Sequence, residues 1–478
     1  FETGNAISFS LNQENFTSGK GNQTGSTFAK TILTANNKTN TATEHYYLYL
    51  NISNNTFTYT QNENTPEILL TITDGTNPVT NITSLTYKTV TDGKGNRISG
   101  YDITNKKGLI TLFSNREITT TSTKTENWNI TVTFINYNLD QSKNAGKTFS
   151  GKVLIQKEKI KEAIATVCSN GQTLSSCIIA MDGKDDTLYH HTSSLANGAG
   201  DNSYRYAGAN PNNFVCFGSD VSPCPTDNLY RIIGVFEDKV KLIKYDYATS
   251  ALLGTDGDYK DSVVPDPTYY KGSQSSINRY YWNYKNDTSI NNGFGSNEWS
   301  TSLLNKTNLN KNFITNIGDY WANKIAETTW KVGGNTWANI GTQPAKTVYQ
   351  NEIVSPVTTN TTDNATTYSA KIGLMYVSDY MYAAPQDKWT LVGYNSSDAS
   401  KDYRAATSVN WMYMGLFEWT ISRRADRAYS AFGVHSTGFV DFNNVGSYEF
   451  GVRPVFNFSS SVNYVSGSGT AADPILVN

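Results

Sequence analysis

The sequence predicts a mainly β protein, in which an N-terminal β-sandwich or jelly roll is followed by an α+β domain. Its 478 residues are too many for one hydrophobic core and suit two or three domains. Aromatic residues make up 13% of the chain, so real cores can form although the chain is otherwise polar. Thr and Tyr favour strands, Asn and Gly favour turns, and all four are abundant.

We expect residues 1–157 to form the sandwich. Apolar runs recur there at short intervals, and clusters of Gly, Asn and Asp separate them, as in the segments TDGTNP and TDGKGN. Short strands at this spacing, without helical periodicity, are typical of sandwiches and jelly rolls. The expected strands cover residues 46–52, 57–60, 67–73, 109–113, 128–135 and 149–156.

A short linker helix is expected at 158–167. Ile160, Ala163, Ile164 and Val167 recur there at i, i+3, i+4 and i+7, which places them on one face of a helix. This change of period marks the boundary between the two domains.

The second domain, 168–478, combines strands with helices. The segment LYRIIGVFEDKVKLIKYD predicts a hairpin that turns at Glu237 and Asp238. Strands are again expected at the end, within EWTISRR, YSAFGV, GFVDF and GVRPVFNF. The expected helices lie near 298–306, near 318–326, and after a strand that ends at Tyr376, where Ser378 is the expected cap.

The four cysteines form two close pairs, Cys168 with Cys177 and Cys216 with Cys224. Neither pair has the CxxC spacing of a zinc or redox site. We therefore predict two local disulfides, formed in an oxidising compartment and each worth roughly 2–3 kcal/mol. The alternative is four free, buried thiols in a cytosolic protein.

Charge and hydropathy exclude several classes of partner. The formal net charge is −2 and no run of Lys and Arg forms a basic field, so we expect no nucleic-acid partner and no membrane-binding patch. No apolar stretch is long enough to span a membrane. The chain starts at Phe1 rather than Met, which indicates a removed leader. With the predicted disulfides, these features predict an extracellular or cell-surface location.

Residues 418–458 combine Trp419 in a strand, an Arg-rich turn, a central Gly438 and a terminal GVRP from Gly451 to Pro454. This segment resembles the closing motif of bacterial C-type-lectin-like domains. That group includes formylglycine-generating-enzyme-like domains, variable proteins of diversity-generating elements and surface domains of Firmicutes. The resemblance covers roughly the last half of the chain, and it implies a lectin-like fold with a binding face.

This sequence departs from the catalytic members of that group. They use cysteines near the C-terminal motif, and this chain has none after Cys224. The Glu-Pro-Asn motif of calcium-dependent sugar binding is absent, as are G-x-S-x-G, P-loop and Rossmann patterns. We therefore predict that the protein is not an enzyme and has no catalytic residues, no cofactor and no metal site.

Residues 5–11 (NAISFSL) alternate the apolar Ile7, Phe9 and Leu11 with serine, which is the pattern of a strand. One hypothesis is donor-strand exchange, in which this strand completes the open sheet of a neighbouring copy and gives a head-to-tail homopolymer. The alternative is the first strand of its own sandwich. A strand placed before a sandwich loosely resembles TasA-like fibre proteins and bundling pilins.

The Arg-rich turn supplies the candidate ligand-binding residues. Guanidinium and phenol groups suit carbohydrate or acidic-protein ligands. The alternative is an Arg–Asp network that ties loops together and includes Arg453. The candidate residues are Arg423, Arg424, Asp426, Arg427, Tyr429, His435 and Asp441.

Two acidic clusters and a histidine pair are weaker candidates, for Ca²⁺ or another metal. They lack the EF-hand and HExxH patterns, and the adjacent His190 and His191 in a strand point to opposite faces. We favour solvated turn carboxylates and structural histidines. The clusters are Asp182, Asp185 and Asp186, and Asp256, Asp258 and Asp261.

The predicted function is a structural subunit of an extracellular filament or pilus, which polymerises by its N-terminal strand and displays the lectin-like domain. The alternative is a monomeric surface adhesin whose lectin-like domain binds a glycan or a host protein. A third hypothesis, an enzyme of the formylglycine-generating group, is disfavoured because the required thiols are missing.

Overall fold

The computed structural model describes residues 1–11, 21–36, 40–157, 159, 163–284, 293–356 and 366–478. The chain divides into two compact units, unit 1 at Phe1–Lys161 and unit 2 at Glu162–Asn478, and each has its own hydrophobic core. The protein is mainly β, as its sequence predicts. The expected linker helix at 158–167 lies partly outside the described residues, and its described end forms a single 3-10 turn at Ile164–Thr166.

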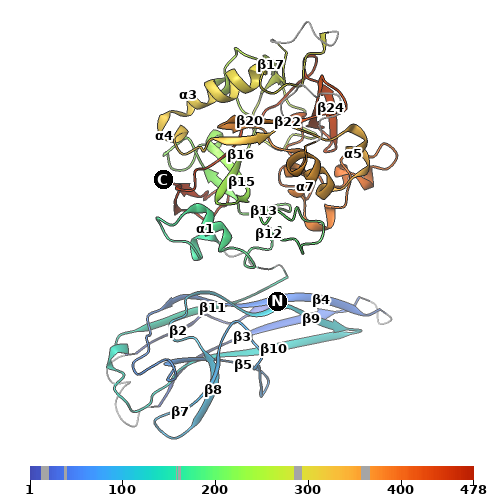
Figure 1. The fold of residues 1–478 in the computed structure, drawn as a ribbon. Helices are drawn as coiled ribbons and strands as arrows, with labels where there is room; N and C mark the ends of the chain where they lie inside the picture. The colour runs from blue at the N-terminus through green and yellow to red at the C-terminus, as the bar shows by residue number, and fades with distance from the viewer. Residues whose placement is uncertain (12–20, 37–39, 158, 160–162, 285–292, 357–365) are drawn as a thin grey trace. The chain divides into compact units, whose positions relative to one another are not determined.

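Unit 1 contains two antiparallel sheets (Figure 1). Along the first lie, in order, β1 (Glu2–Thr3), β3 (Gln23–Thr34), β10 (Thr123–Phe134), β5 (Ile68–Asp74), β8 (Arg97–Asp102) and β7 (Tyr87–Thr91), and the short β6 (Asn77–Pro78) pairs with β5. Along the second lie β2 (Ile7–Ser10), β11 (Thr148–Gln156), β4 (Ala42–Asn55) and β9 (Gly108–Thr120). Side chains of both sheets share one core, so unit 1 is a sandwich.

The core of unit 1 is built from strands in which every second side chain is buried. In β10, Trp128, Ile130 and Val132 are buried, whereas Asn129 between them is exposed. The buried residues of β4 and β5 follow the same alternation for most of their length. Because alternate side chains of a strand point to opposite faces, this pattern is readable in the sequence.

Residues 57–60 do not form the expected strand. Phe57 is buried in the core, and the backbone N–H of Thr58 donates to Asn144 Oδ1 at 3.0 Å, so a side chain takes the place of a neighbouring strand. Strands β3, β7 and β8 are also not among the expected strands. In β3 the buried positions carry Thr27, Ala29 and Thr31, whereas Phe28 and Ile32 are exposed, so the apolar residues do not mark the inner face of the strand.

Unit 2 is organised around a central sheet. Its described strands are, in order, β12 (Leu188–His190), β13 (Tyr204–Tyr206), β15 (Leu229–Phe236), β16 (Lys239–Lys244), β26 (Val455–Asn457) and β21 (Ile372–Gly373), and β14 (Phe214–Cys216) pairs with β15. The predicted hairpin is confirmed, because β15 pairs with β16 across a turn at Glu237 and Asp238. β26, near the C-terminus, pairs with β16 on one side and with β21 on the other.

Smaller sheets and short helices surround the central sheet (Figure 1). The other strands are β17 (Tyr259–Val263), β18 (Ile277–Tyr281) and β25 (Glu449–Phe450); β19 (Thr328–Lys331) and β20 (Thr367–Ala370); β22 (Glu418–Arg423), β23 (Ser430–Val434) and β24 (Val440–Asn444); and β27 (Tyr464–Ser466) and β28 (Leu476–Val477). The α-helices are α1 (Leu174–Ile179), α2 (Ser250–Leu253), α3 (Ile314–Ile317), α4 (Asp319–Ala322), α5 (Trp337–Thr342), α6 (Ala345–Tyr349) and α7 (Val377–Tyr382), and Leu304–Phe313 and Gln350–Val354 are π-helical.

The first expected helix is displaced along the chain. It was predicted near 298–306, whereas the helical segment runs from about Leu304 through the π-helix into α3. Asp258 Oδ2 accepts hydrogen bonds from the backbone N–H groups of Leu303 (3.1 Å) and Leu304 (3.0 Å). A carboxylate distant in the sequence therefore caps this helix start, and no local pattern could reveal it.

The cap of α7 was also predicted wrongly. Tyr376 is the N-cap residue and Ser378 lies inside the helix. Asp379 accepts a hydrogen bond from the Tyr376 backbone N–H at 3.0 Å, so the reciprocal bond of a capping box comes from an Asp at the third position.

Both predicted disulfides are present in unit 2. Cys168 is joined to Cys177 and Cys216 to Cys224, with Cα–Cα distances of 5.3 and 5.9 Å. Each closes a short loop, because the sequence separations are 9 and 8 residues. Among the described residues, no helix has the length and apolar character needed to cross a membrane.

Candidate functional site

The predicted Arg-rich turn connects β22 to β23 at one side of the three-stranded sheet β22–β23–β24. Buried Asn297 holds this turn in place. Its Nδ2 donates to the carbonyl oxygens of Arg424 (3.1 Å) and Arg427 (2.8 Å). The same nitrogen lies 2.9 Å from the carbonyl of Ser430, where β23 begins. A side chain more than a hundred residues away therefore sets the backbone from which the candidate residues project.

Arg423 and Arg424 are buried, at 1% and 7% exposure, so neither presents its guanidinium to solvent. Arg424 donates to Asp426 through Nε (2.7 Å) and Nη2 (2.9 Å), and its guanidinium lies 3.9 Å from the ring centre of Phe442. Burial favours the neutral form of Asp426, but the hydrogen bonds from Arg424 outweigh it, and the pKa of Asp426 lies below its usual value. Arg424 and Asp426, two members of the alternative Arg–Asp network, are therefore paired within the turn itself.

Arg427, Tyr429 and His435 are half-exposed. The Arg427 guanidinium lies 5.4 Å from the ring centre of Tyr429, and His435 stacks on Phe439 at 4.2 Å. Burial, helped by the nearby charge of Arg404, lowers the pKa of His435, so its imidazole is neutral at physiological pH. These three candidates keep surface that a ligand can touch.

Asp441 lies in different surroundings from the other candidates. It lines a hollow of about 450 Å³ together with Phe417 and Tyr448. Burial raises the pKa of its carboxyl group. The structure therefore does not bring Asp441 into the Arg–Asp network.

Arg453 does not join that network either, which corrects the prediction. It is buried and donates to Glu418 through Nε (2.7 Å) and Nη2 (2.8 Å). Glu418 also forms a parallel β-bridge with Gly451, so β22 itself brings the carboxylate beside the GVRP segment. Arg453 and Glu418 thus make a separate buried ion pair.

A band of aromatic rings passes through the candidate region, and we call it the aromatic band. Phe294 and Tyr429 stack at 5.2 Å, and the Arg427 guanidinium links Tyr429 to Phe442, 5.6 Å from the latter ring. The ring contacts then continue from Phe442 to Trp337 (4.8 Å), to Tyr394 (5.5 Å) and to Phe439 (4.6 Å). The aromatic band consists of Phe294, Trp337, Tyr394, Tyr429, Phe439 and Phe442, which are half-buried or, for Phe294, 36% exposed.

Of the residues of this band, only Tyr429 is among the candidates predicted from the sequence. Trp337 is the first residue of α5, where the Thr336 hydroxyl accepts the N–H of Asn339 at 3.2 Å, and Tyr394 lies in a loop. These segments are distant from the Arg-rich turn in sequence. Trp337 and Tyr394 each lie near Gly, Asn or Ser in the sequence, which favours a surface position. No local pattern, however, places them beside Phe442.

The predicted donor strand lies on its own sandwich. β2 is the edge strand of the second sheet, where it pairs with β11, and Ile7 and Leu11 are 2% and 1% exposed. Phe9 is half-buried and stacks on Phe149 at 5.5 Å. A Cβ atom at Gly25 would lie 2.6 Å from Cγ2 of Ile7, so only glycine leaves room for this side chain. The first-strand alternative therefore describes this structure.

The acidic clusters are occupied by local hydrogen bonds and ion pairs. Asp185 accepts from the Thr187 backbone N–H (2.8 Å) and hydroxyl (2.6 Å), and Asp258 caps the helical segment described above. Asp261 forms a two-point ion pair with Arg279, at 2.7 and 2.8 Å. Within the described ranges, no three His, Cys, Asp or Glu side chains come together as a metal site would require.

The two adjacent histidines lie in different surroundings. His190 is half-exposed and stacks on Tyr204 at 4.1 Å. His191 is buried, its Nδ1 accepts the backbone N–H of Ala199 at 3.0 Å, and burial lowers its pKa. A buried neutral imidazole packed against rings fits the structural role that the sequence analysis favoured.

A scan of protein-family models finds no match to this chain, and a search of curated proteins finds none either.

Proposed function

We propose that the chain is an extracellular surface protein that binds carbohydrate through the aromatic band of unit 2, without catalysis. The observation that carries the proposal is the run of half-exposed rings in mutual contact. Partly exposed aromatic rings that contact one another on a rigid support are typical of binding surfaces.

The chemistry of the band suits a sugar. A pyranose ring offers a face of C–H groups that packs on an aromatic ring, while its hydroxyl groups need donors and acceptors at the edge. Arg427 and Arg404, both half-exposed, lie against rings of the band and supply N–H donors there. The Arg424–Asp426 pair and Asn297 fix the turn behind them, so the surface is ordered before a ligand arrives.

The lectin-like resemblance of residues 418–458 supports the same proposal, because that segment contains Tyr429, Phe439 and Phe442. The two disulfides support an oxidising location outside the cytosol. Unit 1 would then serve as the carrier that places unit 2 at a surface.

Glycan-array binding followed by calorimetry on the full chain tests this proposal. Trp337→Ala should weaken binding of the best array ligand at least tenfold, because the substitution removes a central ring. Tyr320→Ala is the matched control, since Tyr320 is 56% exposed and lies outside the band. The proposal is wrong if no glycan binds, or if both variants bind the ligand equally well.

A filament subunit is the second candidate function, and the edge position of residues 2–11 favours it. β1 ends the first sheet and β2 ends the second, so this one segment covers an edge of both sheets of unit 1. Ile7 fits the gap at Gly25, as a donor side chain fits an acceptor pocket. Transfer of the segment to a neighbouring copy would give a head-to-tail polymer.

Electron microscopy of the purified chain tests the filament. Filaments should form, and they should be lost when residues 2–11 are deleted and blocked when a peptide of residues 2–11 is added in excess. Lys30→Met is the control, because it removes an exposed ion pair with Glu2 (3.3 Å) and leaves the strand pairing in place. A monomeric intact chain at high concentration would exclude this function.

A further inference from the structure

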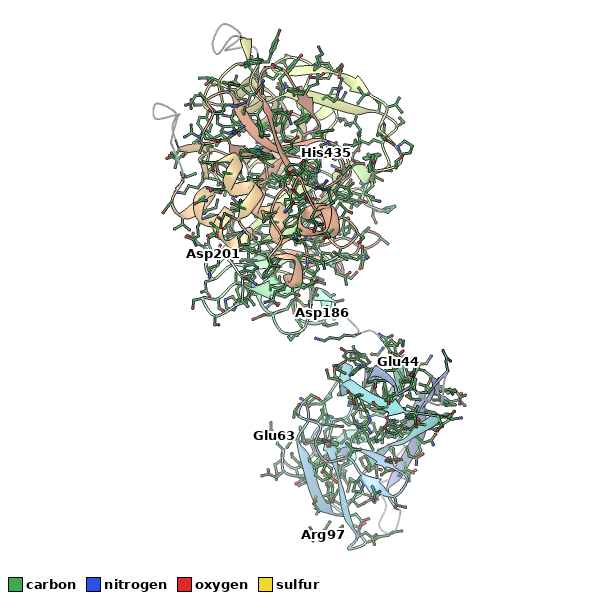
Figure 2. The ribbon with its side chains drawn as sticks, turned by 90° about the vertical axis from the view of Figure 1, so that its right-hand side faces the viewer. Glu44, Glu63, Arg97, Asp186, Asp201 and His435 are labelled. Carbon is green, nitrogen blue, oxygen red and sulfur yellow. A yellow bond between two sulfur atoms is a disulfide. The ribbon has the colours of Figure 1, made fainter. Side chains whose placement is uncertain are left out.

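A second candidate site lies in unit 2, apart from the aromatic band. It is a cavity of about 540 Å³, and we call it the Lys241 cavity. Figure 2 labels Asp201, which lines this cavity, and His435, which contacts the band, and the two lie well apart on unit 2. Strands β13, β16 and β19 and helices α6 and α7 all contribute to the walls. The volume falls in the range of small-molecule sites, about 300–1,000 Å³.

Three buried charges line the cavity. The side chains of Lys241, Arg205 and Asp379 are 6%, 3% and 1% exposed. Lys241 Nζ donates to Asp379 Oδ2 at 2.5 Å, whereas Nη1 of Arg205 is 3.7 Å from Asp379 Oδ1, beyond hydrogen-bond distance. Asp379 therefore lies within 4.0 Å of two cations, and Arg205 is paired more closely with Asp201, at 2.5 Å.

Donors remain available on Lys241. An ammonium group has three N–H donors, and in the described part of the chain Lys241 makes one hydrogen bond, to Asp379. Its other near neighbours are ring faces, with Nζ 4.3 Å from the ring centre of Tyr376 and 5.1 Å from that of Phe236. A buried donor without an acceptor costs free energy, and an incoming carboxylate would supply that acceptor.

The mouth of the cavity carries charge of the opposite sign as well. Glu237 and Glu327 are exposed there, and Asp201 is partly exposed and pairs with Arg205 at 2.5 Å. Counting Lys239 and Lys331, four cationic and four carboxylate side chains line the cavity. This balance disfavours a polyanion, because its remaining charges would meet carboxylates.

We propose that the Lys241 cavity binds a small zwitterion, a molecule with one free carboxylate and one free ammonium group. The carboxylate would lie on Lys241 and Arg205, and the ammonium group on the carboxylates at the mouth. Phe236 and Trp330, which also line the cavity, would contact an apolar side chain of the ligand. Free amino acids and short peptides both have this chemistry. The inference goes beyond glycan binding and does not depend on it.

Calorimetry on the full chain tests the proposal. The probes are L-leucine, L-phenylalanine and the dipeptide leucyl-phenylalanine, each compared with its N-acetyl and its C-terminal amide derivative. At least one unmodified probe should bind, and both of its blocked forms should bind at least tenfold more weakly, because each lacks one of the two charges. Binding of the amino acids alone, or of the dipeptide alone, separates the two sources.

Two variants locate the binding. Thr329 is an exposed residue on β19 that lines the cavity, so Thr329→Trp should fill it and reduce binding at least tenfold without touching the buried charges. Thr367→Trp, on the neighbouring strand β20 and outside the lining, should bind like the unmodified chain. The proposal is overturned if no unmodified probe binds, if the blocked forms bind equally well, or if Thr329→Trp binds normally. Trp337→Ala should leave zwitterion binding unchanged, so a failure of the glycan proposal is seen separately.

Discussion

Two of the regions of buried charge in unit 2, around Arg453 and around Lys241, differ in what surrounds them. Around Arg453, a guanidinium and the Glu418 carboxylate are 1% and 2% exposed and joined by two hydrogen bonds. Arg453 Nη2 also donates to the Met412 carbonyl at 2.6 Å. Around Lys241, the charged side chains are buried to a similar degree but line a cavity. The charged groups around Arg453 are therefore enclosed by protein, whereas those around Lys241 border a cavity.

This difference separates a structural ion pair from a candidate site. Burying an ion pair is expensive, and the cost is offset only when the remaining donors and acceptors are satisfied. The fork of Arg453 is matched by a carboxylate and by backbone carbonyls, so nothing further can bind there. Lys241 makes one hydrogen bond among the described residues, so a ligand can supply acceptors for its other N–H donors.

Removal of Arg453 should produce the largest effect on stability. Arg453→Met leaves Glu418 buried without its cation, which should lower the free energy of unfolding by about 3–5 kcal/mol. Arg279→Met is a matched control, because Arg279 makes the same two-point pair with Asp261 at 29% and 38% exposure and should lose at most about 1 kcal/mol.

Urea unfolding followed by tryptophan fluorescence measures both variants. Trp128 is the one tryptophan in residues 1–161, so the other eight of the nine report on unit 2. Equal losses in the two variants would show that burial does not determine the strength of these pairs.

Glu352 sharpens the comparison, because it is a buried carboxylate beside the Lys241 region with no ion pair among the described residues. It accepts hydrogen bonds from the Ser422 hydroxyl (2.5 Å) and from the backbone N–H groups of Val377 (3.2 Å) and Ser378 (3.0 Å). Burial nevertheless dominates and raises its pKa from 4.5 to about 7.

The stability of unit 2 should therefore depend on pH through Glu352. Between pH 4.5 and 7 the folded form binds a proton that the unfolded chain lacks, so this contribution is fully present at low pH and is lost as pH rises through 7. Glu352→Gln should remove that slope and, at pH 8, raise the free energy of unfolding by up to about 3 kcal/mol. Urea titrations of both proteins from pH 5 to 8 measure the difference. Parallel profiles would mean that Glu352 has an ordinary pKa.

The strands of unit 1 could be predicted where burial alternates along the chain. In β10, Trp128, Ile130 and Val132 mark the inner face without reference to any other segment. The strand prediction for residues 57–60 failed because Phe57 is buried although its segment is irregular. The backbone of that segment bonds to the Asn144 side chain instead of a neighbouring strand. An alternation of apolar residues predicts a strand correctly only where the segment also forms backbone hydrogen bonds to a neighbouring strand.

The sites of unit 2 depend on contacts that no local pattern contains. The alternation in KVKLIK predicts β16 correctly but would leave its lysines in solvent, whereas Lys241 is buried because Asp379, 138 residues later, lies beside it. Arg427 and Tyr429 were found from the Arg-rich turn, but the Arg453 pairing was predicted wrongly because Glu418 was not considered as a partner. The signal for a buried Lys241 that the sequence offered was its position between Val240 and Leu242 in a predicted strand.

The smallest of the three effects is expected at Lys241. Lys241→Met removes the 2.5 Å hydrogen bond to Asp379, but that carboxylate keeps the Tyr376 backbone N–H at 3.0 Å and Arg205 at 3.7 Å, and water can enter the cavity beside it. The loss should be about 1–3 kcal/mol, below that of Arg453→Met. Lys239→Met, on the same strand and paired with exposed Asp238, should change stability by less than about 0.5 kcal/mol.

Urea unfolding of Lys241→Met, Asp379→Asn and the double variant measures the coupling between the two groups. If the cavity solvates the unpaired carboxylate, the coupling should be clearly smaller than in the corresponding cycle of Arg453→Met with Glu418→Gln. A loss at Lys241 as large as that at Arg453 would mean that the cavity does not admit water to Asp379. The open side of this region would then have no energetic consequence, and the distinction between an enclosed pair and a site would fail.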